Sequence, residues 1–211
     1  MKRGVTPRLV VIAGSLYACV SSLQGAPGAL RYSSPSSQTM RLSMRELWTD
    51  QVVWTRQYIV AVVAGDPSAS VALARLMRNQ DDIGNVVKPL YGDAAGAKLT
   101  QLLKQHVAIA SELSAAVKAG DAGTQASANK RWHDNAGDIA SFLAGANPNW
   151  SRPSLEAMLN RHLALTKQET LDRLRQNWTA DQVTFDTILG QAMEMADALA
   201  NGIIKQFALR A

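Results

Sequence analysis

The sequence predicts an all-α protein, an up-down four-helix-type bundle with one extra short helix, preceded by a signal peptide and a flexible linker. Apolar residues recur every three to four positions from about residue 43 onward, as on the buried face of a helix. No segment shows the strict apolar-polar alternation of a half-buried strand. Ala, Leu, Gln and Met are abundant, and these side chains lose little rotamer freedom in a helix.

The N-terminus has the pattern of a secretory signal peptide. Residues 1–8 are basic, and the apolar segment 9–16 is too short to cross a bilayer. Cleavage is expected near residue 28, in a stretch of small residues, or before Cys19, where the residues Leu-Tyr-Ala-Cys resemble a bacterial lipobox. We therefore expect an exported protein that is periplasmic, secreted or anchored to the bacterial envelope through a lipid on Cys19.

The chain is accordingly divided into three parts. Residues 1–28 form the signal peptide, or a lipoprotein signal that ends before Cys19. Residues 29–42 form a flexible linker, because they are rich in Ser, Gly and Pro and cannot bury a core. Residues 43–211 form the helical domain. Cys19 is the only cysteine, so no disulfide can form within the chain.

The first helix is expected to begin at Ser43, since Ser43 and Glu46 have the spacing of a capping box. It runs to about Ala64, and a short helix over 69–79 follows a Gly-Asp-Pro-Ser turn. The stretch 81–93 is expected to be irregular because it contains three helix breakers. These are Gly84, Pro89 and Gly92.

The rest of the domain is expected to consist of long helices joined by short loops, as in an up-down bundle. Their ranges are 93–119, 124–143, from a cap at Ser154 to at least Glu169, and 181–207.

The charge of the chain argues against nucleic-acid binding. The 22 Lys and Arg exceed the 17 Asp and Glu by five. Three of the basic residues, Lys2, Arg3 and Arg8, lie in the expected signal peptide, and without them the net charge is near +2. No cluster of Lys and Arg forms the basic stripe of a nucleic-acid-binding protein. Membrane association is expected only through a lipid on Cys19.

Polar side chains interrupt the apolar faces of several predicted helices. They are Gln51, His106, Asn135, His162, Gln191 and Glu194. A buried polar group without a partner costs about 1–3 kcal/mol, so several together predict a hydrogen-bonded network or a wet cavity. This set either fixes the register of the helices or binds a small ligand. Trp54 and Tyr58, on the same face of the first helix, complete the candidate ligand-binding residues.

A single transition-metal ion is the alternative ligand. His106, His162 and Glu194 lie on three different helices that a bundle can bring together, and their side chains are metal ligands. A di-iron centre is disfavoured, because no Glu precedes a His by three residues.

No catalytic residue is assigned. The chain lacks the phosphate-binding Gly-rich loop, the G-x-S-x-G turn, the H-E-x-x-H motif and the C-x-x-C-H haem motif. Tyr91 and Trp150 lie at helix breaks and are expected to close the ends of the bundle or to line the mouth of a pocket. His133 is expected on the surface. Arg56 is expected to pair with Asp82 or Glu194.

Several short motifs together resemble a family of uncharacterised bacterial helical proteins, over residues 47–207. They are Leu47-Trp48, Trp54-Thr55-Arg56, Pro89-Leu90-Tyr91-Gly92-Asp93, Asn147-Pro148-Asn149-Trp150, His162-Leu163-Ala164-Leu165-Thr166 and Glu194-Met195-Ala196-Asp197. Members of that family often carry the labels glycosyltransferase or acetylglutamate kinase. Neither a nucleotide-sugar fold nor a kinase phosphate loop fits an all-helical chain, so the resemblance implies a fold and no activity.

The resemblance also implies a histidine in the first helix between Trp48 and Trp54, where this chain has Gln51. If the family binds a metal through histidines on three helices, this chain lacks one ligand.

Three hypotheses for the function follow from the sequence. The leading one is a non-enzymatic extracytoplasmic bundle whose polar core is structural or binds a small ligand. The others are a metal-binding protein or metal-dependent enzyme, and an interaction module anchored to the envelope.

Overall fold

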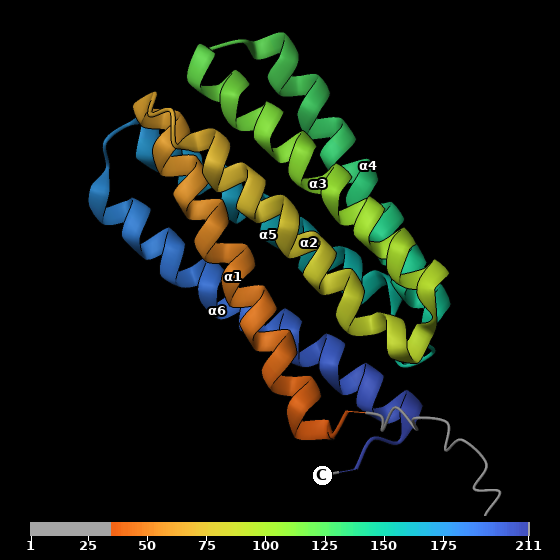
Figure 1. The fold of residues 1–211 in the computed structure, drawn as a ribbon. Helices are drawn as coiled ribbons and strands as arrows, with labels where there is room; N and C mark the ends of the chain where they lie inside the picture. The colour runs from red at the N-terminus through yellow and green to blue at the C-terminus, as the bar shows by residue number, and fades with distance from the viewer. Residues whose placement is uncertain (1–34, 211) are drawn as a thin grey trace, which may run out of the picture. The chain divides into compact units, whose positions relative to one another are not determined.

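The computed structural model describes residues 35–210, which form six α-helices and no strand (Figure 1). The prediction of an all-α chain is confirmed for this range. The helices are α1 (Ser37–Ala64), α2 (Ala69–Tyr91), α3 (Asp93–Ala119), α4 (Ala122–Ala146), α5 (Arg152–Leu174) and α6 (Trp178–Phe207). None of these helices is long and apolar enough to span a membrane. The predicted signal peptide, Cys19 and residues 29–34 of the predicted linker lie outside the described residues.

The expected four-helix-type bundle with one short helix is corrected to a bundle of six long helices, because the expected short helix, α2, does not end at residue 79. It continues through Gly84 and Pro89 to Tyr91. Gly84 lies against Gly96 of α3, and a methyl group on either glycine would collide with the backbone carbonyl of the other. Gly84 therefore allows two helices to approach closely, and it does not break α2. Pro89 lies in the last turn of α2, where only one backbone hydrogen bond is lost.

The first helix begins earlier than the sequence indicates. Ser36 is its N-cap, and the Ser36 hydroxyl accepts a hydrogen bond from the backbone N–H of Thr39 at 3.1 Å. Met40, in the following turn, is 1% exposed. Residues 37–42, which the sequence assigned to the linker, are therefore helical because Met40 has a place in the core.

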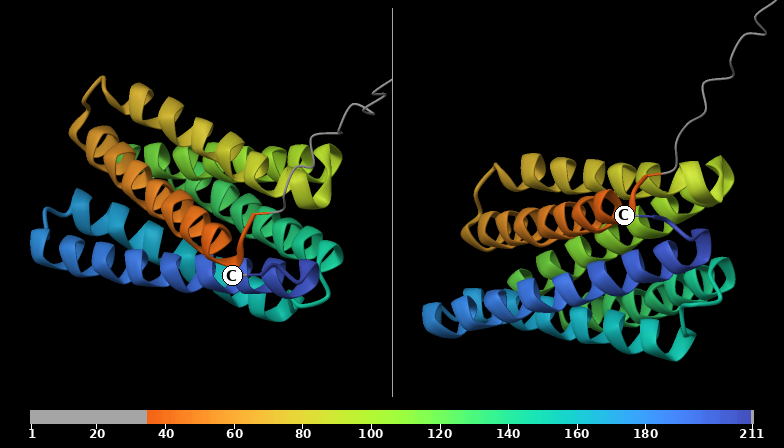
Figure 2. Two further views of the ribbon diagram at one scale, coloured as in Figure 1. Left: turned by 60° about the horizontal axis from the view of Figure 1, so that its bottom comes forward. Right: turned by 90° about the horizontal axis from the view of Figure 1, so that it is seen from below.

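The six helices form three hairpins, α1–α2, α3–α4 and α5–α6, arranged in a closed ring (Figures 1 and 2). The first helices of the hairpins, α1, α3 and α5, contact one another at the centre. Each second helix packs in the angle between two of them: α2 against α1 and α3, α4 against α3 and α5, and α6 against α5 and α1. The domain thus has approximate threefold symmetry, and each hairpin corresponds to one third of it.

Equivalent positions on the three central helices carry the same kind of side chain. Met44, Leu99 and Leu155 each lie seven residues before a polar residue of the centre, and all three are buried. The first two hairpin turns also correspond. Gly65 and Gly120 end α1 and α3 in the left-handed conformation, with φ of 75° and 70°, which glycine adopts without strain.

One end of the bundle is closed by aromatic rings, as predicted for Tyr91 and Trp150. The ring of Tyr91 stacks on Trp150 at 6.2 Å and meets the edge of Phe207 at 5.0 Å. The amide of Asn147 donates to the Tyr91 hydroxyl at 2.9 Å, and that hydroxyl donates to Gln206 at 2.7 Å. Burial raises the pKa of Tyr91 to about 12, against the opposing effect of Asn147. Because side chains fill this end of the bundle, a ligand site is expected in the middle of the bundle.

Candidate functional site

A small cavity lies at the centre of the bundle, where the three central helices meet. Its lining includes Gln51 and Tyr58 of α1, His106 of α3, His162 of α5 and Trp132 of α4. The cavity has a volume of about 20 Å³, which is the space needed for one water molecule. All five of these side chains are buried. The structure therefore brings four of the predicted ligand-binding residues, Gln51, Tyr58, His106 and His162, to one site.

His106 is held by an amide of the second helix of its own hairpin. Its Nδ1 lies 2.7 Å from Oδ1 of Asn135 on α4, and the Asn135 amide nitrogen donates to the backbone carbonyl of Leu102 at 3.2 Å. Since that nitrogen is the donor, Oδ1 is the acceptor, and Nδ1 of His106 must carry the proton. Nε2 of His106 is left with its lone pair.

His162 repeats this arrangement on the next hairpin. Its Nδ1 lies 3.1 Å from Oε1 of Gln191 on α6, and the Gln191 amide nitrogen donates to the backbone carbonyl of Met158 at 3.0 Å. The same reasoning places the proton on Nδ1 and the lone pair on Nε2. Neither Nε2 has a hydrogen-bond partner within residues 35–210. Two bare imidazole nitrogens are therefore available at one cavity.

The first hairpin has the same arrangement, with glutamine in place of histidine. Asn79 of α2 donates to the backbone carbonyl of Leu47 at 3.1 Å, as Asn135 does to Leu102. Oε1 of Gln51 accepts from Gln80 at 2.6 Å and from Asn79 at 3.3 Å. Oδ1 of Asn79, the counterpart of the oxygen that accepts from His106, is buried and has no partner among the described residues. The third position is thus built like the other two but lacks a ring N–H.

The sequence contains this threefold repeat, which our reading of the periodicity missed. Positions 51, 106 and 162 are separated by 55 and 56 residues, and each bonds a side chain 29 residues further along. The second helices repeat as well, because Arg75, Asn79, Asp82 and Ile83 recur 56 residues later as Arg131, Asn135, Asp138 and Ile139. A search for internal repeats would have found these spacings.

Both buried histidines are neutral at pH 7. Burial lowers the pKa of His106 to about 4, aided by the nearby His162 and opposed by the bond to Asn135. Burial also lowers the pKa of His162, and the bond to Gln191 opposes that change. The ring of His106 lies 5.3 Å from that of Trp132. A neutral imidazole can bind a metal ion or accept a hydrogen bond, whereas an imidazolium can do neither.

Four of the predicted site residues do not line the cavity. Asn135 and Gln191 hold the histidines from the second helices, and Glu194 and Trp54 lie outside the site. Glu194 is exposed, with 69% of its side chain accessible, and pairs with Arg161 at 3.4 Å. It corresponds in the repeat to Asp82 and Asp138, which are also exposed. Trp54 is only half-buried and lies beside the guanidinium of Arg75, 5.5 Å from the ring centre. Within residues 35–210 no three His, Cys, Asp or Glu side chains could hold a metal ion, so the proposed His106, His162 and Glu194 centre is wrong.

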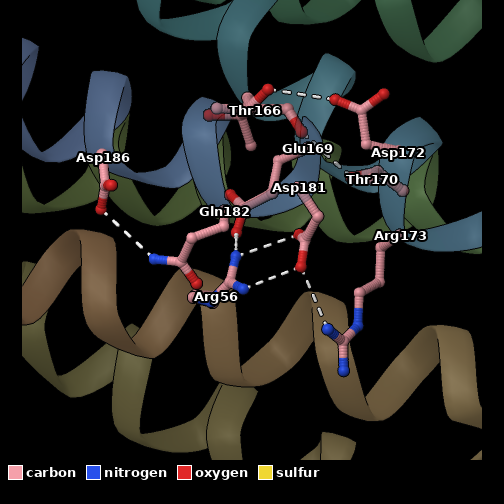
Figure 3. A network of polar contacts seen from close by, with 10 residues as sticks. Arg56, Thr166, Glu169, Thr170, Asp172, Arg173, Asp181, Gln182 and Asp186 are labelled. Carbon is pink, nitrogen blue, oxygen red and sulfur yellow. Dashed lines mark hydrogen bonds and ion pairs between the residues drawn. The ribbon is translucent and has the colours of Figure 1, made fainter. Parts of the chain in front are cut away.

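A second buried polar centre lies further along α1, α5 and α6, and sequence reasoning missed it (Figure 3). The guanidinium of Arg56 contacts Glu169 at 2.6 Å and makes two bonds to Asp181, at 3.1 and 2.8 Å. Arg173 adds a contact to Asp181 at 3.1 Å. Glu169 and Asp181 are 1% and 2% exposed. Arg56 and Arg173 therefore supply the two cations that face the two buried carboxylates.

The partners expected for Arg56 are corrected by this geometry. Asp82 instead lies 3.8 Å from Arg75, and Glu194 pairs with Arg161. Burial raises the pKa of Glu169 to about 7, although Arg56 opposes the rise.

His133 lies on the surface as predicted, with Nδ1 2.6 Å from Oδ1 of Asn160. That exposed pair is a natural reference for the buried His106–Asn135 pair.

A wider groove of about 370 Å³ lies on the surface between α3 and α4. The ion pair of Arg131 and Glu112, at 2.6 Å, and the carboxylate of Asp138 line it. Its polar lining consists of carboxylates, a guanidinium and amides, and no histidine is among the lining residues. Comparison of the chain with protein-family models, curated proteins and solved structures gave no match. Function must therefore be argued from the geometry alone.

Proposed function

We propose that this protein is a non-enzymatic, exported binding protein that holds one ligand of about the size of a water molecule between His106 and His162. The observation that carries the proposal is the pair of neutral imidazoles, each with Nδ1 occupied by an amide and Nε2 free at the same cavity. A ligating histidine usually donates its other ring N–H to an acceptor that fixes the ring, and a side-chain amide oxygen has this position at both histidines.

The size of the cavity supports binding over catalysis. An enzyme that acts on an organic substrate needs room for that substrate beside its acid or base, and such pockets measure about 300–1,000 Å³. A space of about 20 Å³ admits a single small molecule or ion. The export part of the proposal rests on the basic and apolar segment at residues 1–16.

Nitrogen NMR of the histidine rings tests the binding proposal. We expect His106 and His162 to have the proton on Nδ1, and both Nε2 signals to shift together when the correct ligand is added from a set of ammonium, Cu(I) and Zn(II). His133 is the internal control. If no member of the set moves both buried Nε2 signals, the proposal is wrong. Export is tested separately by the N-terminus of the protein from its native host, which should begin after residue 18 or near residue 29.

A further inference from the structure

The ligand of the central cavity follows from the chemistry of its lining, and this inference rests on the proposed function above. The groups that line it are two neutral imidazoles, one amide and several hydroxyls, among them Oγ1 of Thr166, which has no partner within residues 35–210. Apolar side chains such as Ile59, Leu76 and Val107 complete the lining. No carboxylate is among the lining residues. A divalent ion would therefore keep an uncompensated charge in an apolar site, which is costly, while a monovalent ion would leave much less.

The donor atoms narrow the choice among monovalent ligands. Oε1 of Gln51 is occupied by two amide donors, so Gln51 can offer only its N–H groups to the cavity. An ammonium ion also has only donors, and it would meet Gln51 donor to donor. A bare metal ion needs only the two Nε2 lone pairs. Imidazole nitrogen is a ligand that suits copper.

We propose that His106 and His162 bind a single Cu(I) ion through Nε2, and that position 51 is the third ligand position of this threefold centre, occupied here by glutamine. The unpartnered Oδ1 of Asn79 supports the second statement. On the other two hairpins the equivalent amide oxygen accepts from Nδ1 of a histidine, at 2.7 and 3.1 Å. A histidine at position 51 would supply that missing donor.

Anaerobic competition of the full chain with a Cu(I) chelator tests the proposal. All variants carry Cys19→Ser, because a thiolate also binds Cu(I). We expect one Cu(I) per chain, and a loss of affinity of more than about 100-fold in His106→Phe and in His162→Phe. His133→Phe is the matched control and should bind as the parent does. The absence of stoichiometric Cu(I) binding, or equal binding by parent and His106→Phe, overturns the proposal.

The second test adds a ligand. In Gln51→His we expect an affinity for Cu(I) at least about 10-fold higher, and we expect Zn(II), which the parent binds weakly, to bind at a three-histidine site. If Gln51→His binds Cu(I) and Zn(II) no better than the parent does, position 51 is not a ligand position. X-ray absorption of the Cu(I)-loaded parent should show two nitrogen ligands and no sulfur. Because this measurement needs no substitution in the helical domain, only Cys19→Ser, it decides the copper site even if a phenylalanine variant fails to fold.

The outcomes separate this inference from the proposed function. If ammonium or Zn(II) shifts both Nε2 signals and Cu(I) does not, the protein binds a small ligand and the copper inference is wrong. If none of the three shifts them, both are wrong.

Discussion

The two buried polar centres share helices α1 and α5, but one contains neutral groups and the other contains charged groups. The central site contains only neutral groups, and each hairpin contributes one equivalent residue, Gln51, His106 or His162. The Arg56 centre contains four ionic groups, and it has no threefold counterpart, since Ser111 and Lys167 occupy the positions equivalent to Arg56. The threefold symmetry of the domain is thus retained at the central cavity, which all three hairpins line. It is lost at the Arg56 centre, where ion pairs connect only some of the helices.

This difference predicts different consequences of substitution. A neutral polar group that loses its partner leaves one unsatisfied hydrogen bond, whereas a buried carboxylate that loses its cation leaves a charge in a poorly solvated place. The charged centre should therefore respond most strongly.

The largest effect is expected for Arg56→Met, which leaves Glu169 and Asp181 buried without their main cation. We expect the free energy of unfolding in urea at pH 7 to fall by about 3–5 kcal/mol. Arg152→Met, which breaks the exposed Arg152–Glu156 pair, is the control and should cost less than about 1 kcal/mol. Equal losses in the two variants would show that Arg56 does not compensate a buried charge.

A smaller effect is expected at the neutral centre. Asn135→Leu and Gln191→Leu should each lower the free energy of unfolding by about 1–3 kcal/mol, because each leaves a buried ring N–H unpaired. The two losses should be similar, since the positions are equivalent. Asn160→Leu removes the exposed partner of His133 and should cost almost nothing. If Asn160→Leu lowers the free energy of unfolding as much as Asn135→Leu does, burial does not determine how much a histidine–asparagine hydrogen bond contributes to stability.

The two centres should also respond to pH with opposite signs. The folded pKa of Glu169, about 7, lies above its unfolded value, so its contribution is full below about 4.5 and is lost as pH rises through 7. The folded pKa of His106, about 4, lies below its unfolded value, so its contribution is full above about 6.5 and is lost as pH falls through 4.

Urea unfolding between pH 4.5 and 7 separates these contributions. In Glu169→Gln we expect stability to rise with pH, by up to about 1.4 kcal/mol per pH unit for each histidine. In the parent the opposing change at Glu169 should flatten this rise. An identical pH profile for the parent and Glu169→Gln would contradict a raised pKa at Glu169.

The smallest effect is expected for Glu194→Gln. Its side chain is exposed, and its contact with Arg161 is long, at 3.4 Å. We expect a change in stability of less than about 0.5 kcal/mol and no change in the ring signals of His106 or His162. A shift of either ring signal would show that Glu194 does belong to the central site.

Helical periodicity predicted the positions of most helices and the five buried polar residues Gln51, His106, Asn135, His162 and Gln191, because both depend on which face of a helix is apolar. It could not place Glu194 and Trp54 correctly. Each lies three residues after an inward-facing residue, Gln191 or Gln51, and three residues turn a helix about 60° away from the starting direction. At the edge of the apolar face of a helix, the burial of a residue depends on the neighbouring helix, and periodicity does not predict where that helix lies.

Pairing between helices was the second limit. The partners of His106 and His162 depend on the register of two helices in a hairpin, and the spacing of 29 residues records that register. The partners of Arg56 come from α5 and α6, more than 100 residues away in sequence, with no repeat to reveal them. Gly84 was misread for a related reason: its role depends on Gly96 of another helix.

The hydrogen bond from the Ser37 N–H to the Arg210 carbonyl, at 2.7 Å, brings the two ends of the helical domain together (Figure 2). A ring of three hairpins with adjoining ends has no required starting point. A circular permutant that begins at Asp93, with residues 210 and 36 joined by a short linker and the chain ending at Gly92, would keep every hairpin intact and every neighbour in place. The order of the three hairpins along the chain can therefore be changed without changing their arrangement around the cavity.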